Sequence, residues 1–207
     1  MSAVPPFEAT LPASAFTEAA ADFKKTLPPV NTGGNFLKLR RTDGVWVYGK
    51  DGVEVEDESQ WAVNPHSISK GFIAWHAGRP EGEKMARIGQ PAILAADLPP
   101  VSAKNGWEVQ VGFDLVCISG EDTDVEVNYK TNTQGGIGAF DAIFNALSAR
   151  AAAGQAFVPI VELGETNYNH PENGLIYKPV FKIVGWAGDE TTAIEDEEAP
   201  KRRRKAK

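Results

Sequence analysis

Cysteine is almost absent from this sequence of 207 residues, and so are long hydrophobic runs. The one cysteine, Cys117, excludes a disulfide framework within the chain and predicts a reducing compartment. No run approaches the about 18 apolar residues of a membrane-spanning helix, and the N-terminus lacks the basic and then apolar segments of a signal peptide. These absences predict a cytoplasmic protein without a membrane partner.

Motifs of catalytic and cofactor sites are missing as well. Gly135, Gly136 and Gly138 are followed neither by the Lys-Ser/Thr pair of a phosphate-binding loop nor by a GxGxxG spacing. No serine stands in a nucleophile-elbow pattern, and His66 and His76 have no further ligand at metal-binding spacing. We therefore predict that the protein is not an enzyme and that it needs no metal or other cofactor.

Proline and glycine, by contrast, are plentiful, with 14 and 20 residues. Because both residues favour turns between short strands, the chain is expected to be mainly β with one or two helices. We expect three parts: an N-terminal arm over residues 1–33 with a short helix over 14–27, a core domain over 34–187, and a disordered tail over 188–207. The tail has too few apolar residues to form a core of its own.

Strands are predicted where β-branched and aromatic residues dominate or alternate with polar ones. The best examples are a hairpin over residues 36–49, a strand over 106–118 that pairs with 125–130, and two last strands over 157–163 and 175–186. A stretch over residues 164–174, rich in Gly, Asn and Pro, is expected to form the loop between the last two strands.

A helix is predicted over residues 137–153, where apolar side chains recur at helical spacing and Gly154 follows as a stop signal. A sheet with this helix against it is the expected centre of the fold. Pro159 and Pro179 lie inside the last two predicted strands, and because proline donates no ladder hydrogen bond they should lie at edges or bulges.

Basic residues stand beside aromatic residues in two segments, 36–49 and 61–76. Cations that follow phosphates, and flat rings that stack on bases, are what a groove for single-stranded nucleic acid requires. The alternative is that these rings belong to the core and the basic residues form a solvated face, so only some of the rings are expected to face a groove. The candidate DNA-binding residues are Lys38, Arg40, Arg41, Trp46, Tyr48, Trp61, Lys70, Phe72 and Trp75.

The charge balance limits where nucleic acid can bind. The net charge is −7; six of the 28 acidic and six of the 21 basic residues follow Gly188, so the body keeps 22 acids and 15 bases. A uniformly basic surface is therefore excluded, and any nucleic-acid footprint must be local.

The order of these parts resembles that of bacteriophage single-stranded DNA-binding proteins, in which a strand-rich body precedes an acidic C-terminal tail. Two patches are similar to small phage replication proteins: WAVNPHSISKGFIAWHAG with GEKM after it, and VPIVEL followed by GLIYKPVFKIVGW. The resemblance implies an OB-like Greek-key barrel over residues 36–187. It also implies sequence-nonspecific binding of single-stranded DNA during phage replication or recombination, in the cytoplasm of the bacterial host.

The same resemblance implies a tail that contacts replication or recombination proteins and competes with DNA for the groove. The matching acids are Asp189, Glu190, Glu195, Asp196, Glu197 and Glu198. This chain departs from the pattern by ending in KRRRKAK, which either pairs with the acids or binds nucleic acid itself. The rival interpretation is a non-enzymatic structural or protein-interaction module, such as a virion or replication accessory protein; both interpretations allow a homo-oligomer.

Overall fold

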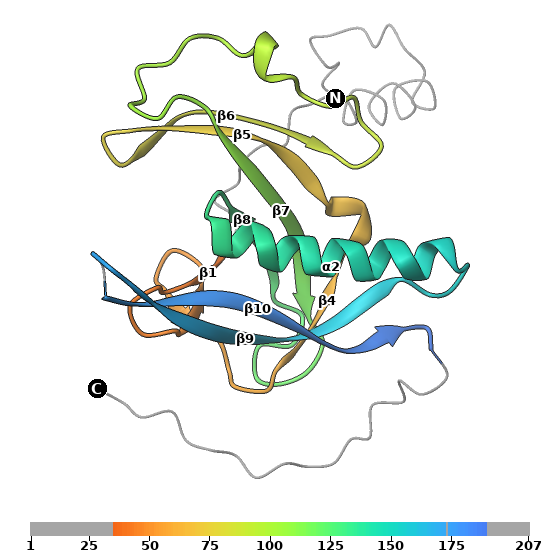
Figure 1. Ribbon diagram of the computed structural model, residues 1–207. Helices are drawn as coiled ribbons and strands as arrows, with labels where there is room; N and C mark the ends of the chain where they lie inside the picture. Colours follow the sequence, from red (N-terminus) through yellow and green to blue (C-terminus); the bar gives the residue numbers. More distant parts are fainter. Residues whose placement is uncertain (1–34, 173, 190–207) are drawn as a thin grey trace, which may run out of the picture. The chain divides into compact units, whose positions relative to one another are not determined.

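The computed structural model describes residues 35–172 and 174–189. The predicted N-terminal arm with its helix, and the tail beyond Asp189, lie outside the described residues. The elements of the described part are, in chain order, β1 (Phe36–Leu39), β2 (Trp46–Tyr48), β3 (Val53–Glu54), β4 (Gln60–Val63), η1 (Pro65–Ser67), β5 (Ser69–His76), β6 (Arg79–Arg87), η2 (Ala95–Asp97), β7 (Glu108–Cys117), β8 (Glu126–Thr131), α2 (Gln134–Ala152), β9 (Val158–His170) and β10 (Gly174–Ala187) (Figure 1).

These strands form one curled sheet, so the expectation of a mainly β protein with a helix is confirmed. The strand order is β10-β9-β4-β7-β8-β1-β2-β3. β5 follows β4 through the short 3-10 helix η1, pairs with the first half of β7, and carries β6 on its other edge. Neighbouring strands are antiparallel except β1 and β8, which pair in parallel.

The β1–β2 hairpin, near one end of the strand order, meets β9 and β10 at the other end through hydrogen bonds. The backbone N–H of Tyr177 in β10 donates to the carbonyl of Arg41 at 3.1 Å, and the indole Nε1–H of Trp46 in β2 donates to the carbonyl of Gly164 in β9 at 2.9 Å. The sheet therefore curls round into a half-barrel. Figure 1 shows α2 running between the β5–β6 hairpin and the β9–β10 hairpin.

Large apolar side chains fill the inside of this curl. Trp61 and Phe113 are completely buried, and the Phe181 ring contacts those of Phe113 and Tyr129 at centroid distances of 5.2 and 5.0 Å. Helix α2 closes the core with Ile143 and Leu147, which are four residues apart and so lie on one face of the helix. Burial of this apolar surface is the main source of the fold's stability.

Several boundaries predicted from sequence are confirmed. The hairpin over 36–49 is β1 with β2, and the strand over 106–118 is β7, paired with β8. Pro179 lies on β10, the strand at one end of the sheet order, and Pro159 lies beside the register shift between Ile183 and Gly185. Both prolines thus avoid positions where a ladder N–H is needed, as expected.

Two stretches outside the predicted strands are strands in the structure. Residues 79–87 form β6, which pairs with β5 along its length. The predicted loop over 164–174 is mostly strand, because β9 continues to His170 in register with β10, which begins at Gly174. Helix α2 starts at Gln134, three residues earlier than predicted, because the Thr133 side chain caps it by accepting from the Gly136 N–H at 3.2 Å.

Candidate nucleic-acid interface

Three of the predicted stacking rings hold the fold together instead of facing solvent. Trp46 is 5% exposed, and Trp61 is fully buried with its Nε1–H donating to the Ser59 hydroxyl at 3.0 Å. Tyr48 is half-buried; its hydroxyl donates to Asp122 at 2.7 Å and its ring lies edge-on to Trp61. A base cannot stack on Trp46 or Trp61 in this structure, so the prediction that these two rings are stacking platforms is wrong.

A second group of predicted residues lies on β5. Lys70 and Trp75 are exposed, Trp75 with 42% of its surface, and Phe72 is half-buried. Phe72 pairs with Lys84 of β6 on one side and with Val109 of β7 on the other. These residues remain candidates, but they do not line the groove described next.

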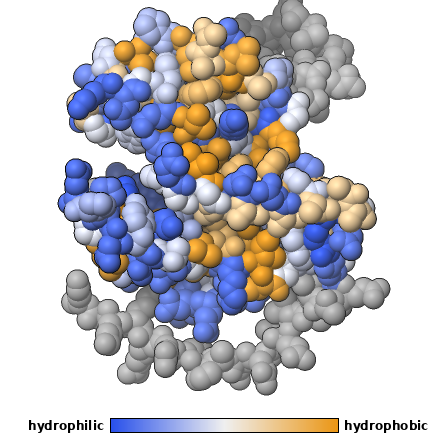
Figure 2. Space-filling view, in the orientation of Figure 1, coloured by the Kyte–Doolittle hydropathy of each residue, from blue (hydrophilic) through white to orange (hydrophobic). Residues whose placement is uncertain are grey.

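A groove of about 620 Å³ lies where β1, the end of β8, the first turn of α2 and the β9–β10 hairpin come together. Two of the predicted residues, Lys38 and Arg41, line it. The others were not predicted from sequence; those used below are Glu108, Tyr129, Lys130, Gly135, Tyr168, Tyr177 and Lys178. Figure 2 shows a hydrophilic, hollowed surface on the left of the molecule, near the start of α2.

The groove is locally basic. Four cations line it, Lys38, Arg41, Lys130 and Lys178, against a single carboxylate, Glu108. Among the described residues, Lys38, Arg41 and Lys178 make no ion pair. In a chain of net charge −7, these side chains form a local concentration of positive charge.

Tyr168, which is exposed, and Lys178, which is half-buried, form an aromatic–cation pair on the β9–β10 hairpin. The Lys178 Nζ lies 5.2 Å from the centre of the Tyr168 ring, which is 38% exposed. The aliphatic part of Lys178 passes close to α2: a Cβ added at Gly135 would lie 2.8 Å from its Cγ. The bare backbone of Gly135 therefore allows the lysine to approach the start of the helix.

Tyr177, the other tyrosine of the hairpin that lines the groove, has a structural position. A Cβ added at Gly44 would lie 2.6 Å from its Cδ1, and Gly44 has a φ of +73° that favours glycine. The Tyr177 ring therefore packs directly on the β1–β2 turn. Together with the hydrogen bond to Arg41, this contact fixes one wall of the groove.

Arg40 is engaged outside the groove. Its guanidinium contacts Asp43 at 2.9 Å and Glu54 at 3.1 Å. The hydrogen bond from Arg40 lowers the pKa of the Asp43 carboxyl below its usual value, so both partners stay charged near neutral pH. The three basic residues of the predicted strand therefore separate into two that line the groove and one that is paired with acids.

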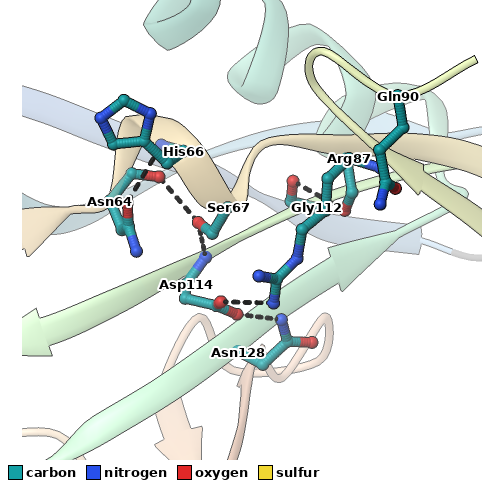
Figure 3. A network of polar contacts seen from close by, with 9 residues as sticks. Asn64, His66, Ser67, Arg87, Gln90, Gly112, Asp114 and Asn128 are labelled. Carbon is teal, nitrogen blue, oxygen red and sulfur yellow. Dashed lines mark hydrogen bonds and ion pairs between the residues drawn. The ribbon is translucent and has the colours of Figure 1, made fainter. Parts of the chain in front are cut away.

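A polar network supports the strands beside the groove (Figure 3). The Asp114 N–H on β7 donates to the Ser67 hydroxyl at 2.7 Å, and the Ser67 hydroxyl donates to the Asn64 carbonyl at 2.7 Å. The Asp114 carboxylate accepts from the Asn128 amide at 2.5 Å and lies 3.6 Å from the Arg87 guanidinium. These contacts tie η1, β6, β7 and β8 together, so the outer face of β7 and β8 is held in a fixed arrangement.

The acidic tail begins at the far end of α2. Arg150 donates to both carboxylate oxygens of Asp189, at 2.6 and 2.7 Å, and its guanidinium lies 4.6 Å from the Trp186 ring centre. Both hydrogen bonds come from the Nη2 of Arg150, and charge-assisted contacts of this kind are stronger than neutral hydrogen bonds. Of the six predicted tail acids, Asp189 is thus placed beside the helix end, and the other five lie outside the described residues.

Comparison with protein-family models, with curated proteins and with solved structures finds no significant match. Within residues 35–172 and 174–189, no three or more His, Cys, Asp or Glu side chains are grouped to hold a metal ion. Cys117 is buried, and its burial raises the pKa of the thiol, which disfavours the nucleophilic thiolate. No helix in the described part of the chain has the length and apolar character of a membrane span.

Proposed function

We propose that this protein binds single-stranded DNA without strong sequence preference, through the basic groove, and acts in phage DNA replication or recombination. The observation that carries the proposal is the groove itself: four cations face a single carboxylate, although the chain as a whole is acidic. Phosphate backbones are attracted to such a site whatever the base sequence.

Strand connectivity supports an OB-like barrel as the framework of this groove. An OB-fold is a five-stranded, partly open Greek-key barrel in which the face of strands 2 and 3, with the loops after strands 1 and 4, binds oligonucleotides. In this chain β4 together with β5 corresponds to the first of those five strands. The other four correspond to β7, β8, β9 and β10, and α2 stands between the third and the fourth. The pairs β4–β7, β7–β8, β4–β9 and β9–β10 are all antiparallel, as this arrangement requires.

The β1–β2 hairpin lies in the remaining gap of that barrel, between β8 and β10. It pairs with β8 on one side through β1, and on the other side Arg41 accepts from Tyr177 of β10. The groove then lies between β8 and the β9–β10 hairpin, which corresponds to the loop after strand 4. This is the region that an oligonucleotide occupies in the OB architecture.

The proposed mechanism divides the work between cations and one ring. Lys38, Arg41 and Lys178 contact successive phosphates, and Tyr168 offers its exposed face to a base. Stacking on an aromatic ring contributes about 1–3 kcal/mol per base and tolerates every base, because each base has a π-face. The contacts therefore give affinity without a sequence code.

The rival function, a structural or protein-interaction module, is favoured by one specific observation. Trp46 and Trp61, two of the rings expected to stack on bases, are core residues. If the basic groove instead receives an acidic segment of a partner protein, the same cations serve a protein contact. The two functions differ in whether the free protein binds an oligonucleotide in the absence of any other protein.

A salt-dependent titration distinguishes the two. We expect labelled oligo-dT to bind more tightly than a duplex of equal length, and Lys38→Ala with Arg41→Ala to flatten the plot of log K against log salt by about 1.4, or about 0.7 for each lost contact on a single strand. The matched control is Arg40→Ala with Lys182→Ala, which removes two positive charges outside the groove and should leave the slope nearly unchanged. Absence of binding at low salt would overturn the proposal in favour of the structural module.

A further inference from the structure

One cation of the groove, Lys130 on β8, is already paired with a carboxylate from β6, which β7 and β5 separate from β8. Its Nζ lies 2.9 and 3.0 Å from the two carboxylate oxygens of Glu83 on β6. Glu83 does not line the groove, whereas Lys130 does. Lys130 therefore differs from Lys38, Arg41 and Lys178, which make no ion pair within the described part of the chain.

The backbone favours this pairing. Gly112 of β7 pairs with Lys130 of β8, and a Cβ added at Gly112 would lie 3.0 Å from the Lys130 Cγ and 2.5 Å from the Tyr129 carbonyl. The bare backbone at Gly112 thus lets the Lys130 side chain cross β7 toward β6. On the far side, the Glu83 carboxylate also accepts from the Gln110 amide at 2.9 Å, which fixes its position.

The pair is only partly shielded from water. The side chains of Lys130 and Glu83 are 23% and 32% exposed. Ion pairs that water can reach contribute little free energy, so the lysine exchanges one oxygen partner for another at little cost. A phosphate oxygen that enters the groove is chemically a close substitute for the carboxylate oxygen that Lys130 holds.

We propose that Glu83 sets the affinity of the groove by occupying Lys130 in place of a phosphate. This inference rests on the proposed function, since it concerns the same groove and a single-stranded nucleic acid as its ligand. In the native chain the lysine must leave Glu83 to reach a phosphate, so its net contribution to binding is small. Removing the carboxylate charge makes Lys130 a further phosphate contact.

The test is Glu83→Gln, whose amide oxygen still accepts from Gln110 while the negative charge is lost. We expect a salt slope for oligo-dT that is steeper by about 0.7, so that the affinity ratio of variant to native protein rises about 2.6-fold between about 200 and 50 mM salt. In the Glu83→Gln background, Lys130→Ala should return the slope to its native value.

The matched control is Glu162→Gln, because Glu162 forms a comparable pair with Lys182 away from the groove and its loss changes the net charge equally. Circular dichroism checks that each variant is folded. If Glu83→Gln does not fold, Glu83→Ala takes its place as the test variant. If native protein binds oligo-dT and both Glu83 variants keep its slope, this inference is wrong and the proposed function stands. If native protein and variants all fail to bind at low salt, the proposed function itself is wrong.

Discussion

Lys178 and Tyr168 contact each other across the two strands of the β9–β10 hairpin, with the lysine Nζ 5.2 Å from the ring centre. In the strand register Lys178 is opposite Thr166 and Tyr168 is opposite Ile176, so the two side chains are diagonal neighbours. The pair is oriented by a cation–π attraction of about 0.5–1 kcal/mol at exposed sites. A cation and a flat ring are therefore already side by side at the groove before any ligand binds.

The first prediction concerns this ring. Tyr168→Leu should weaken binding of oligo-dT by about 1–3 kcal/mol, which is the usual contribution of one stacked base. Tyr168→Phe is the matched control, since it keeps the ring and loses only the hydroxyl, and it should bind nearly as native protein does. Fluorescence anisotropy with labelled oligo-dT measures both. Equal losses in the two variants would mean that the hydroxyl, not stacking, is what the ligand contacts.

A second prediction concerns Trp46, which was predicted to line a groove but lies in the core. Trp46→Ala should lower the free energy of unfolding by about 3–5 kcal/mol, because it leaves a cavity among buried rings. Trp46→Phe refills most of that volume but leaves the Gly164 carbonyl without its indole donor, and it should cost about 1–3 kcal/mol. Urea unfolding followed by circular dichroism provides both values. A Trp46→Ala variant as stable as native protein would contradict the assignment of this ring to the core.

The sequence pattern was sufficient to predict those strands in which apolar and polar residues alternate strongly. In β7, Val111, Phe113, Leu115 and Cys117 are all buried, as their spacing predicts, whereas Val109, at the same spacing, is 40% exposed. The same spacing puts Trp46 and Tyr48 on one side of β2, but it does not say which side faces the core. That choice depends on the curl of the whole sheet, and here it directs the Trp46 indole to Gly164, far along the chain.

Other strands, and the groove itself, depend on contacts with residues distant in the sequence, which a local pattern does not contain. The β6 sequence RPEGEKMAR has no β-branched residue, and its strand exists because β5 pairs with it. Tyr168 lies among Asn and His residues that favour a loop, yet the register with β10 extends that segment. The groove combines side chains from β1, β8, α2 and β9–β10, so only Lys38 and Arg41, which share one predicted hairpin with aromatic residues, were predicted.

The third prediction concerns the acidic tail, whose start is fixed by the pair between Arg150 and Asp189. Arg150 lies 16 residues after Gln134 in α2, or about 24 Å along the helix from the groove at a rise of 1.5 Å per residue. Residues 195–198 follow Asp189 by six to nine positions, which corresponds to at most about 20–32 Å of chain. Glu198 is therefore within reach of the groove, whereas Glu195 falls slightly short of it.

A variant that ends at Asp189 keeps the Arg150 pair and removes both the acids that follow and KRRRKAK. If the tail is a net competitor, this variant should bind oligo-dT more tightly than the full chain, most at low salt, where screening of charges is weakest. A second variant that lacks only residues 190–200 keeps the basic end and reports its separate effect. Weaker binding by the variant that ends at Asp189 would show instead that KRRRKAK is a DNA-contacting arm, because only a favourable contact can be lost by removing it.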